Sequence, residues 1–113
     1  MSLNSLIINT LKPLNVPVEF NTYDLSDDTY IVFMEYNQGS GLNADDDEFA
    51  TNHFFQADIF SRGNYLKLAK DVKKLLKEVG FTRINEFDGD YEPNMKRFRK
   101  TMRFCHSTIK EEM

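Results

Sequence analysis

Apolar side chains at helical spacing predict two helices, one at the start of the chain and one in its second half. In residues 3–14 the leucines and isoleucines form one apolar stripe. Ser2 can cap this helix, and Pro13 is expected to end it, because the residue before a proline is pushed out of the helical region. In residues 64–79 apolar side chains follow i, i+3, i+4, i+7 spacing, and lysines dominate the opposite face. Gly80 then supplies the left-handed residue on which many helices end.

Alternating segments rich in aromatic and β-branched residues predict five strands. They cover residues 16–20, 29–36, 49–60, 81–87 and 97–109. The strand at 29–36 is largely apolar on both faces, which is typical of a covered central strand. Pro17 suits an edge strand, because proline cannot donate a backbone hydrogen bond. The order α-β-β-β-α-β-β predicts an α+β fold in which helices pack on one face of a mostly antiparallel sheet.

A polar segment over residues 37–48 separates two of these strands. It reads NQGSGLNADDDE and ends in the four consecutive acids Asp45, Asp46, Asp47 and Glu48. This composition does not build a core, so we expect a flexible acidic hairpin loop within a single domain that spans residues 1–113. The acids lack the ligand pattern of a calcium loop, and a solvated tip that can dock a partner is the better interpretation.

The charge distribution adds an asymmetry to this pattern. The chain carries a net charge of −4, but residues 1–60 hold ten acids and one base, whereas residues 61–113 hold eight acids and thirteen bases. Charge that is segregated in this way bears on association rather than on fold. No apolar run is long enough to span a membrane, so no membrane partner is expected.

The residues that most often carry catalysis or metal binding do not form a recognisable group. Cys105 is the only cysteine, and it stands next to His106 in a predicted strand. Neighbouring residues of a strand point to opposite faces, so these two cannot easily form a nucleophile–base pair. The other histidine, His53, has no metal ligand at a recognisable spacing. We therefore expect no catalytic residues, no metal and no cofactor, and we expect that the chain is not an enzyme.

A segment over residues 96–104 mixes bases with aromatic residues and is the second candidate for binding. Its charged members Lys96, Arg97, Arg99 and Arg103, together with the acidic run at 45–48, are the candidate interface residues. One interpretation is a small nucleic-acid-binding or regulatory module that uses this strand. The other is an ordinary strand with a solvated basic face, or a basic subunit interface, and the acidic sequence pI of about 5.1 favours this second interpretation.

The second half of the chain also resembles a known family. The strings FFQADIFSRGNYLKLAKDVKKLLKEVGF and FRKTMRFCHSTI are similar to small tail-completion (tail terminator) proteins of long-tailed bacteriophages and prophages. In that family an alternating strand leads directly into an amphipathic helix that ends at Gly-Phe, and a final strand carries a Met-Arg-Phe-like core. Here these features are Phe55–Phe60, Asn64–Val79, Gly80-Phe81 and Met102–Phe104.

The resemblance implies a structural role in virion assembly. Tail-completion proteins form rings, commonly hexameric, on the head-proximal end of the tail tube and create the surface that joins the head connector. The implied partners are further copies of the chain, the tail-tube protein and the head-connector protein, with nucleic acid not expected. The implied location is the virion tail, made in the cytoplasm of a bacterial host.

Overall fold

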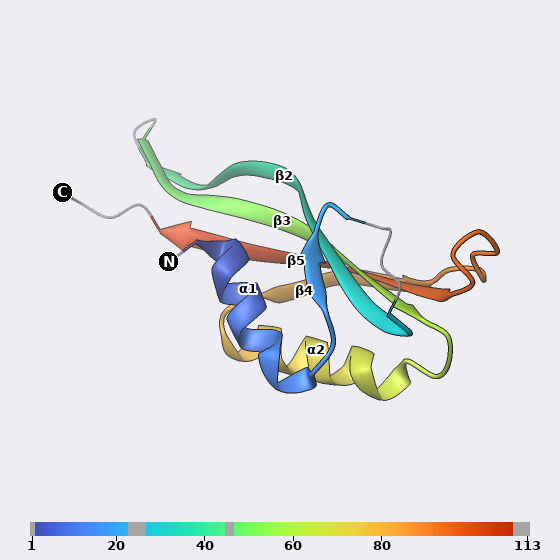
Figure 1. Cartoon of the computed structure of the whole chain (residues 1–113). Coiled ribbons are helices and arrows are strands. Elements are labelled where there is room, and N and C mark those ends of the chain that lie inside the picture. Colours follow the sequence, from blue (N-terminus) through green and yellow to red (C-terminus); the bar gives the residue numbers. More distant parts are fainter. Residues whose placement is uncertain (1, 23–26, 45–46, 110–113) are drawn as a thin grey trace.

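The protein folds into a five-stranded sheet with both helices packed on one face (Figure 1). A computed structural model describes residues 2–22, 27–44 and 47–109. The elements follow the predicted order α-β-β-β-α-β-β, with a short 3-10 helix added after the first helix. Three of the four described strand pairings are antiparallel. The predicted α+β class with a mostly antiparallel sheet is therefore confirmed.

The first helix, α1, spans Leu3–Leu11, and the 3-10 helix η1 continues it over Lys12–Leu14. The Ser5 amide donates a 3.1 Å hydrogen bond to Ser2 Oγ, so the predicted cap is present. The α-helix ends two residues before Pro13, which lies inside η1 rather than after the last helical turn. A proline is tolerated there, because the first amides of a helix have no intrahelical acceptor.

The second helix, α2, spans Leu66–Glu78 and ends in a tight turn at Gly80, as predicted. Gly80 has a φ of 99°, and the amides of Gly80 and Phe81 donate hydrogen bonds of 3.2 and 3.0 Å to carbonyls of the last helical turn. This pair of bonds is a Schellman motif. A Cβ added at Gly80 would lie 3.1 Å from Nε2 of His106, so both the backbone angle and the available space favour glycine.

The sheet is not ordered as the chain is. Its strands are β1 (Val18–Phe20), β2 (Thr29–Ala44), β3 (Asp47–Ser61), β4 (Thr82–Asp88) and β5 (Phe98–Ile109). In space they lie in the order β1-β2-β3-β5-β4, so β5 is inserted between β3 and β4. β1 is an edge strand parallel to β2 and begins just after Pro17, whose carbonyl accepts a 2.9 Å bond from the Ile31 amide. Pro17 thus occupies the edge position expected for it.

The prediction of a loop over residues 37–48 is wrong, because the described part of this segment is β-strand. β2 continues to Ala44 and β3 begins at Asp47, so the two strands form a long ribbon (Figure 1). Register shifts along β2, the first between Glu35 and Asn37, accommodate its glycine-rich and asparagine-rich sequence. Composition indicated only that this segment cannot build a core. A ribbon does not need one, because backbone pairing satisfies its amides and carbonyls.

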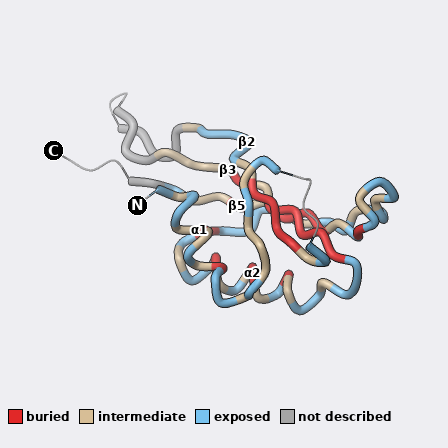
Figure 2. Tube along the Cα trace, viewed as in Figure 1, coloured by how far each residue is buried: buried red, intermediate tan, exposed pale blue. Residues whose placement is uncertain are grey.

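The main core lies between the sheet and the helices, and the buried strand positions lie in the part of the sheet away from the turn end of the ribbon (Figure 2). Its members are Ile7 and Leu11 from α1, Ala69, Val72 and Leu76 from α2, Phe81 from the turn after α2, and Ile31, Phe33, Phe55, Ala57, Ile59, Met102 and Phe104 from the sheet. Apolar side chains at 3.6-residue spacing on the helices thereby meet period-two positions on the strands. Within the described residues, no helix is both long and apolar enough to cross a membrane.

A second, smaller cluster lies on the opposite face of the sheet. Met95, from the connection between β4 and β5, packs against Tyr30, Val32 and Phe60. Residues 30–33 of β2 are therefore buried on both faces, as predicted, whereas Glu35 and Tyr36, which belong to the same predicted strand 29–36, are exposed. Beyond this cluster the same face of the sheet is only partly covered.

Candidate functional site

The sheet face opposite the helices, which we call the open face, carries the most distinctive arrangement of side chains. Cross-strand register fixes which residues share it: Gln56 pairs with Arg103, Asp58 with Thr101 and Phe60 with Arg99. Beyond the small cluster around Met95, the open face includes Met34 and Tyr36 from β2, Phe54, Gln56 and Asp58 from β3, Arg99, Thr101, Arg103 and Cys105 from β5, and Asn85 and Phe87 from β4.

Arg97, a candidate interface residue, is a buried structural residue instead. Its side chain is only 3% exposed, and its guanidinium donates to the carbonyls of Asp27 and Met95, each at 2.7 Å. The guanidinium also lies 5.9 Å from the centre of the Tyr30 ring. Its charge therefore holds the β4–β5 connection against the sheet and is not presented to a partner. The sequence showed the charge of Arg97 but not its burial.

Arg99, the next candidate, lies on the open face and is paired there. Its Nη2 contacts Oδ2 of Asp58 at 2.9 Å, and Asp58 is fully buried. The Thr101 hydroxyl donates a 2.6 Å hydrogen bond to the other Asp58 oxygen, and Glu92 lies 3.7 Å from the Arg99 guanidinium. A buried carboxylate needs such partners, because an unpaired charge in this position is costly. Arg99 thus serves mainly to compensate Asp58.

Arg103 differs from both arginines. Among the side chains that the structure describes, no carboxylate forms an ion pair with it. Its guanidinium lies 5.7 Å from the Tyr36 ring centre and 5.6 Å from that of Phe87, and its Nε donates a 3.2 Å bond to Oε1 of Gln56. Gln56 in turn donates to Asp58 at 3.2 Å. A polar network beneath the open face thus holds Arg103 in place.

The rings beside Arg103 are exposed to solvent. Tyr36 is 44% exposed and Phe87 is 47% exposed, and a third ring, Phe54, lies 6.1 Å from Tyr36. The register shift next to Tyr36 in β2 makes room for this ring beside Phe54. Together Tyr36, Phe54, Gln56, Phe87 and Arg103 form a strip across β2, β3, β5 and β4, which we call the Arg103 strip.

Sequence reasoning identified Arg103 but missed the other members of the strip. Alternation along the strand predicted at 49–60 does place Phe54 and Gln56 on one face, but it does not show what lies beside them. Nothing in the sequence, however, indicates that β5 inserts between β3 and β4, and this insertion brings Phe87 and Gln56 to opposite sides of Arg103. The missing information is the strand order.

The remaining candidate residues lie away from the strip. Lys96 is exposed in the turn before β5 and has a left-handed φ of 55°. Asp47 and Glu48 are the first residues of β3, at the turn end of the ribbon, while Asp45 and Asp46 lie outside the described residues. About nine residues of extended strand separate this end from the level of Arg103, roughly 30 Å at about 3.3 Å per residue.

An ion-pair cluster ties α2 to β4 on the helix side of the sheet. Lys100 contacts Glu86 at 3.0 Å and Asp88 at 3.3 Å, Lys73 contacts Glu86 at 3.1 Å, and Tyr65 donates a 2.6 Å bond to Asp88. Burial opposes the charge of Glu86, but hydrogen bonds from Lys100 and Lys73 outweigh it and lower the pKa of Glu86. Hydrogen bonds from Tyr65 and Lys100 lower the pKa of Asp88. Burial and the Asp88 carboxylate raise the pKa of Tyr65 to about 12.

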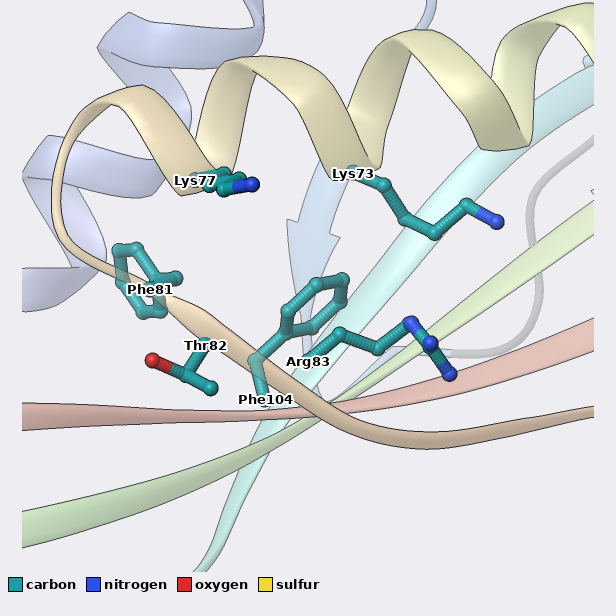
Figure 3. Close-up of a pocket in the computed structure, with 6 residues that line it drawn as sticks. All are labelled: Lys73, Lys77, Phe81, Thr82, Arg83 and Phe104. Carbon is teal, nitrogen blue, oxygen red and sulfur yellow. The ribbon is translucent and has the colours of Figure 1, made fainter.

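A pocket of about 290 Å³ lies between α2 and β4 (Figure 3). It is lined by Lys73, Lys77, Phe81, Thr82, Arg83 and Phe104. Two of its three cations, Lys73 and Arg83, contact Glu86 at 3.1 and 3.2 Å, so Glu86 offsets much of their charge. The positive charge at the pocket is therefore partly neutralised, and the rings of Phe81 and Phe104 form its apolar part. The residues that line it include no cysteine, histidine or carboxylate.

The histidines and the cysteine take part in packing. His106 Nε2 donates a 3.2 Å bond to the carbonyl of Val79, at the end of α2, and His53 Nδ1 lies 2.6 Å from Glu35. Cys105 is half-buried on the other face from His106, and burial raises the pKa of its thiol. Among the described residues, no group of three histidine, cysteine or acidic side chains could hold a metal ion.

Comparison with known proteins leaves the open face as the main guide to function. No family model matches the chain, and no curated protein sequence matches it.

Proposed function

We propose that this chain is a structural assembly protein, the tail-completion subunit of a long-tailed phage or prophage. In this role it caps the tail tube as a ring of six copies, by analogy with the family, and joins the tube to the head connector. Its partners are then other copies of itself, the tail-tube protein and the connector protein. It acts in the virion tail, which is built in the bacterial cytoplasm, and it performs no catalytic step.

The binding role rests on one observation, the exposed rings that flank Arg103 on the open face. Tyr36 and Phe87 are both nearly half exposed, although each carries a large apolar ring. Tyrosine, phenylalanine and arginine are the residue types enriched in the cores of protein interfaces. Exposed aromatic residues gathered on a rigid sheet face are typical of a surface that a partner covers.

The assignment to tail completion rests on the sequence resemblance. The order of elements is compatible with it, because β3 leads through a short connection into α2, and α2 ends at Gly80-Phe81 just before β4. Met102 and Phe104 of the final strand lie in the main core, where a structural motif is expected to lie. The element order and the position of Met102 and Phe104 support the resemblance, and a tube-capping experiment tests the tail-completion role itself.

The test uses tail tubes assembled from a purified tail-tube protein taken from the genome that encodes this chain. Purified protein is added during tube growth, and tube length and end structure are measured by electron microscopy. We expect the wild-type protein to cap the ends and shorten the tubes. The double variant Tyr36→Ser/Phe87→Ser should remain folded and lose capping.

The matched control is Leu66→Ser, because Leu66 is 66% exposed but lies on α2, away from the open face. This variant should cap as well as the wild type. If the wild-type protein neither binds the tubes nor changes their length, the tail-completion role is refuted. If the double variant caps normally, the open face is not the surface that performs it.

One observation favours the alternative of a nucleic-acid-binding module. Exposed rings beside an arginine on an antiparallel sheet are an arrangement on which single-stranded bases can stack. Against it, Arg97 is buried, Arg99 is paired with Asp58, and Lys100 is paired with Glu86. A labelled oligonucleotide distinguishes the two roles, because binding to phosphates weakens steeply as salt rises. Tight, salt-sensitive binding would favour the nucleic-acid module.

A further inference from the structure

Two groups of exposed aromatic rings in this molecule lie beside opposite charges. The first is the Arg103 strip, where Tyr36 and Phe87 flank the guanidinium. The Nε of Arg103 donates to Gln56, and among the described side chains no hydrogen-bond acceptor engages its terminal nitrogens. A planar guanidinium with free terminal N–H groups binds a carboxylate through two parallel hydrogen bonds. The strip therefore has the chemistry of a carboxylate-binding site.

The second group, which we call the Asp90 corner, consists of Asp90, Tyr91 and Phe98. Asp90 and Tyr91 belong to the connection between β4 and β5, which projects from one end of the molecule (Figure 1), and Phe98 is the first residue of β5. Both rings are nearly half exposed, and their centres lie 5.1 Å apart. Asp90 is exposed too, and no side chain that the structure describes forms an ion pair or hydrogen bond with its carboxylate.

Backbone hydrogen bonds hold the Asp90 corner in place. The amide of Gly89 donates a 2.8 Å bond to the carbonyl of Arg99, and the amide of Glu92 donates a 2.8 Å bond to the carbonyl of Arg97. These two bonds stand on either side of Asp90 in the chain, so its backbone is already ordered. A segment that is ordered before it binds loses little conformational entropy on binding.

We propose that the Arg103 strip of one copy binds the Asp90 corner of a second copy of this chain. The Asp90 carboxylate pairs there with the Arg103 guanidinium, and the rings of the corner pack against the rings of the strip. The two surfaces are complementary in charge, and both carry exposed aromatic side chains, which are enriched in the cores of interfaces. This inference rests on the proposed function, because a ring needs a contact between copies, and it names the surfaces that make this contact.

The charges around Arg103 favour a single protein carboxylate over a nucleic-acid backbone. Arg97 is buried and Arg99 is paired with Asp58, so Arg103 is the arginine of the three whose charge is available on the open face. Binding to a nucleic-acid backbone draws on several cations, because each phosphate carries a charge. One available guanidinium between two rings instead matches one carboxylate beside two rings.

A single copy does not form this contact with itself. The amide of Gly89 bonds to Arg99, so Asp90 lies near the start of β5. Arg103 lies about five residues along that strand, roughly 17 Å away at about 3.3 Å per residue. The two side chains do not bridge that distance on one extended sheet. Because the two surfaces differ, the contact between copies is head-to-tail, and its repetition closes into a ring or continues as a filament.

The test is a charge exchange between the two surfaces. One variant is Arg103→Glu, and the other is Asp90→Arg, which should stay folded because Asp90 has no described side-chain partner in its own copy. Self-association of the full chain is measured by sedimentation over a range of protein concentrations, and circular dichroism verifies folding. The matched controls are Lys74→Glu and Glu78→Arg, which make the same two charge changes at exposed positions of α2.

We expect the wild type and both controls to associate equally. Each reversed variant should associate at least about tenfold more weakly on its own, since like charges then face each other. An equimolar mixture of the two should associate again, because Arg103 of the Asp90→Arg copy meets the unchanged Asp90 of the Arg103→Glu copy. The mixture also guards against a folding defect, since an unfolded variant could not restore association.

Several outcomes would overturn the inference. They are a wild type that stays monomeric at all concentrations, association that either reversal leaves unchanged, and two folded variants that do not associate when mixed. An equal loss of association in the controls would also overturn it, because net charge rather than the contact would then be responsible. If Arg103→Glu still associates with itself but loses binding to single-stranded DNA or to tail tubes, the strip serves that other partner instead.

The tail-tube assay reads the proposed function separately. Tube capping by the wild type without the charge exchange would leave the tail-completion role standing and remove only this contact. A charge exchange without any effect on tubes would establish the contact between copies and refute the tail-completion role.

Discussion

Single residues show why charge in the sequence did not indicate function directly. Arg97, Arg99 and Arg103 look equivalent in the sequence, yet one is buried on backbone carbonyls, one compensates Asp58, and one has no described carboxylate partner. The physical difference is burial and pairing, which depend on register rather than on residue type. Only Arg103 keeps its charge available, so only it remains a binding candidate on the open face.

The ion-pair cluster around Glu86, which links α2 to β4, predicts how the stability of the fold depends on pH. The pKa values of Glu86 and Asp88 are lowered in the fold, so their contribution is present above their ordinary values and is lost as pH falls through the folded values. The pKa of Lys100 is raised, so its contribution is present below its ordinary value and is lost only as pH rises above that value, in the alkaline range. We expect the unfolding temperature to fall on acidification below about pH 4.5.

The variant Glu86→Gln tests this assignment. It removes a charged acceptor from Lys100 and Lys73, and it should cost roughly 1–2 kcal/mol in the free energy of unfolding near pH 7. Denaturant titrations near pH 7 and pH 3.5 should show the difference from wild type shrinking in acid, because Glu86 of the unfolded wild-type chain is protonated at the lower pH and its lowered pKa in the fold no longer contributes its full stability. Asp90→Asn is the control, since Asp90 is exposed. An equal difference at both pH values would contradict the assignment.

At the scale of elements, the helices and the core strands were predictable and the ribbon was not. The apolar stripe of α2 and the alternation in β3 indicate which face of each element packs on the main core. This periodicity can be read from the local sequence alone. Residues 37–44 were misread, because glycine, asparagine and acidic residues usually mark a loop, whereas here backbone pairing and β-bulges carry them as strand. The Arg103 strip was beyond prediction, since it depends on β5 lying between β3 and β4.

The stripe of α2 gives a prediction with an internal control. Leu76 is fully buried in the main core, while its neighbour Leu75 is only partly buried. Leu76→Ala should lower the free energy of unfolding by about 2–5 kcal/mol, because it leaves a cavity. Leu75→Ala should cost clearly less. Equal losses in denaturant titrations would mean that α2 is rotated relative to the sheet.

The end of α2 gives a second prediction at this scale. Gly80→Ala places a Cβ on a residue with φ of 99° and within 3.1 Å of His106 Nε2. The loss of stability should be at least about 1 kcal/mol, because a left-handed backbone is unfavourable for alanine. Gly63→Ala serves as the control, since no atom lies within 4 Å of a Cβ there. A neutral Gly80→Ala in thermal unfolding would contradict the Schellman assignment.

The whole molecule measures 51 × 25 × 22 Å, and its long axis reflects a packed body extended by the ribbon. Residues 55–60 of β3 are buried, apart from the partly buried Gln56, whereas residues 51–54 of the same strand are all only partly buried. Local opening is easier where few apolar contacts oppose it. Hydrogen exchange followed by NMR should therefore show faster exchange at 51–54 than at 55–60, and uniform protection along β3 would contradict this division.

The insertion of β5 between β3 and β4 has a consequence for how the protein is made. β5 leaves the ribosome after the other four strands, yet it pairs with both β3 and β4 and joins them into one sheet. Until it arrives, the nascent chain holds an unpaired edge on β3, and β4 has no partner strand among those described. Contacts between residues this far apart in the chain form slowly, and open strand edges favour aggregation while they wait. Folding of the whole sheet is therefore expected to be completed only after synthesis of its final strand.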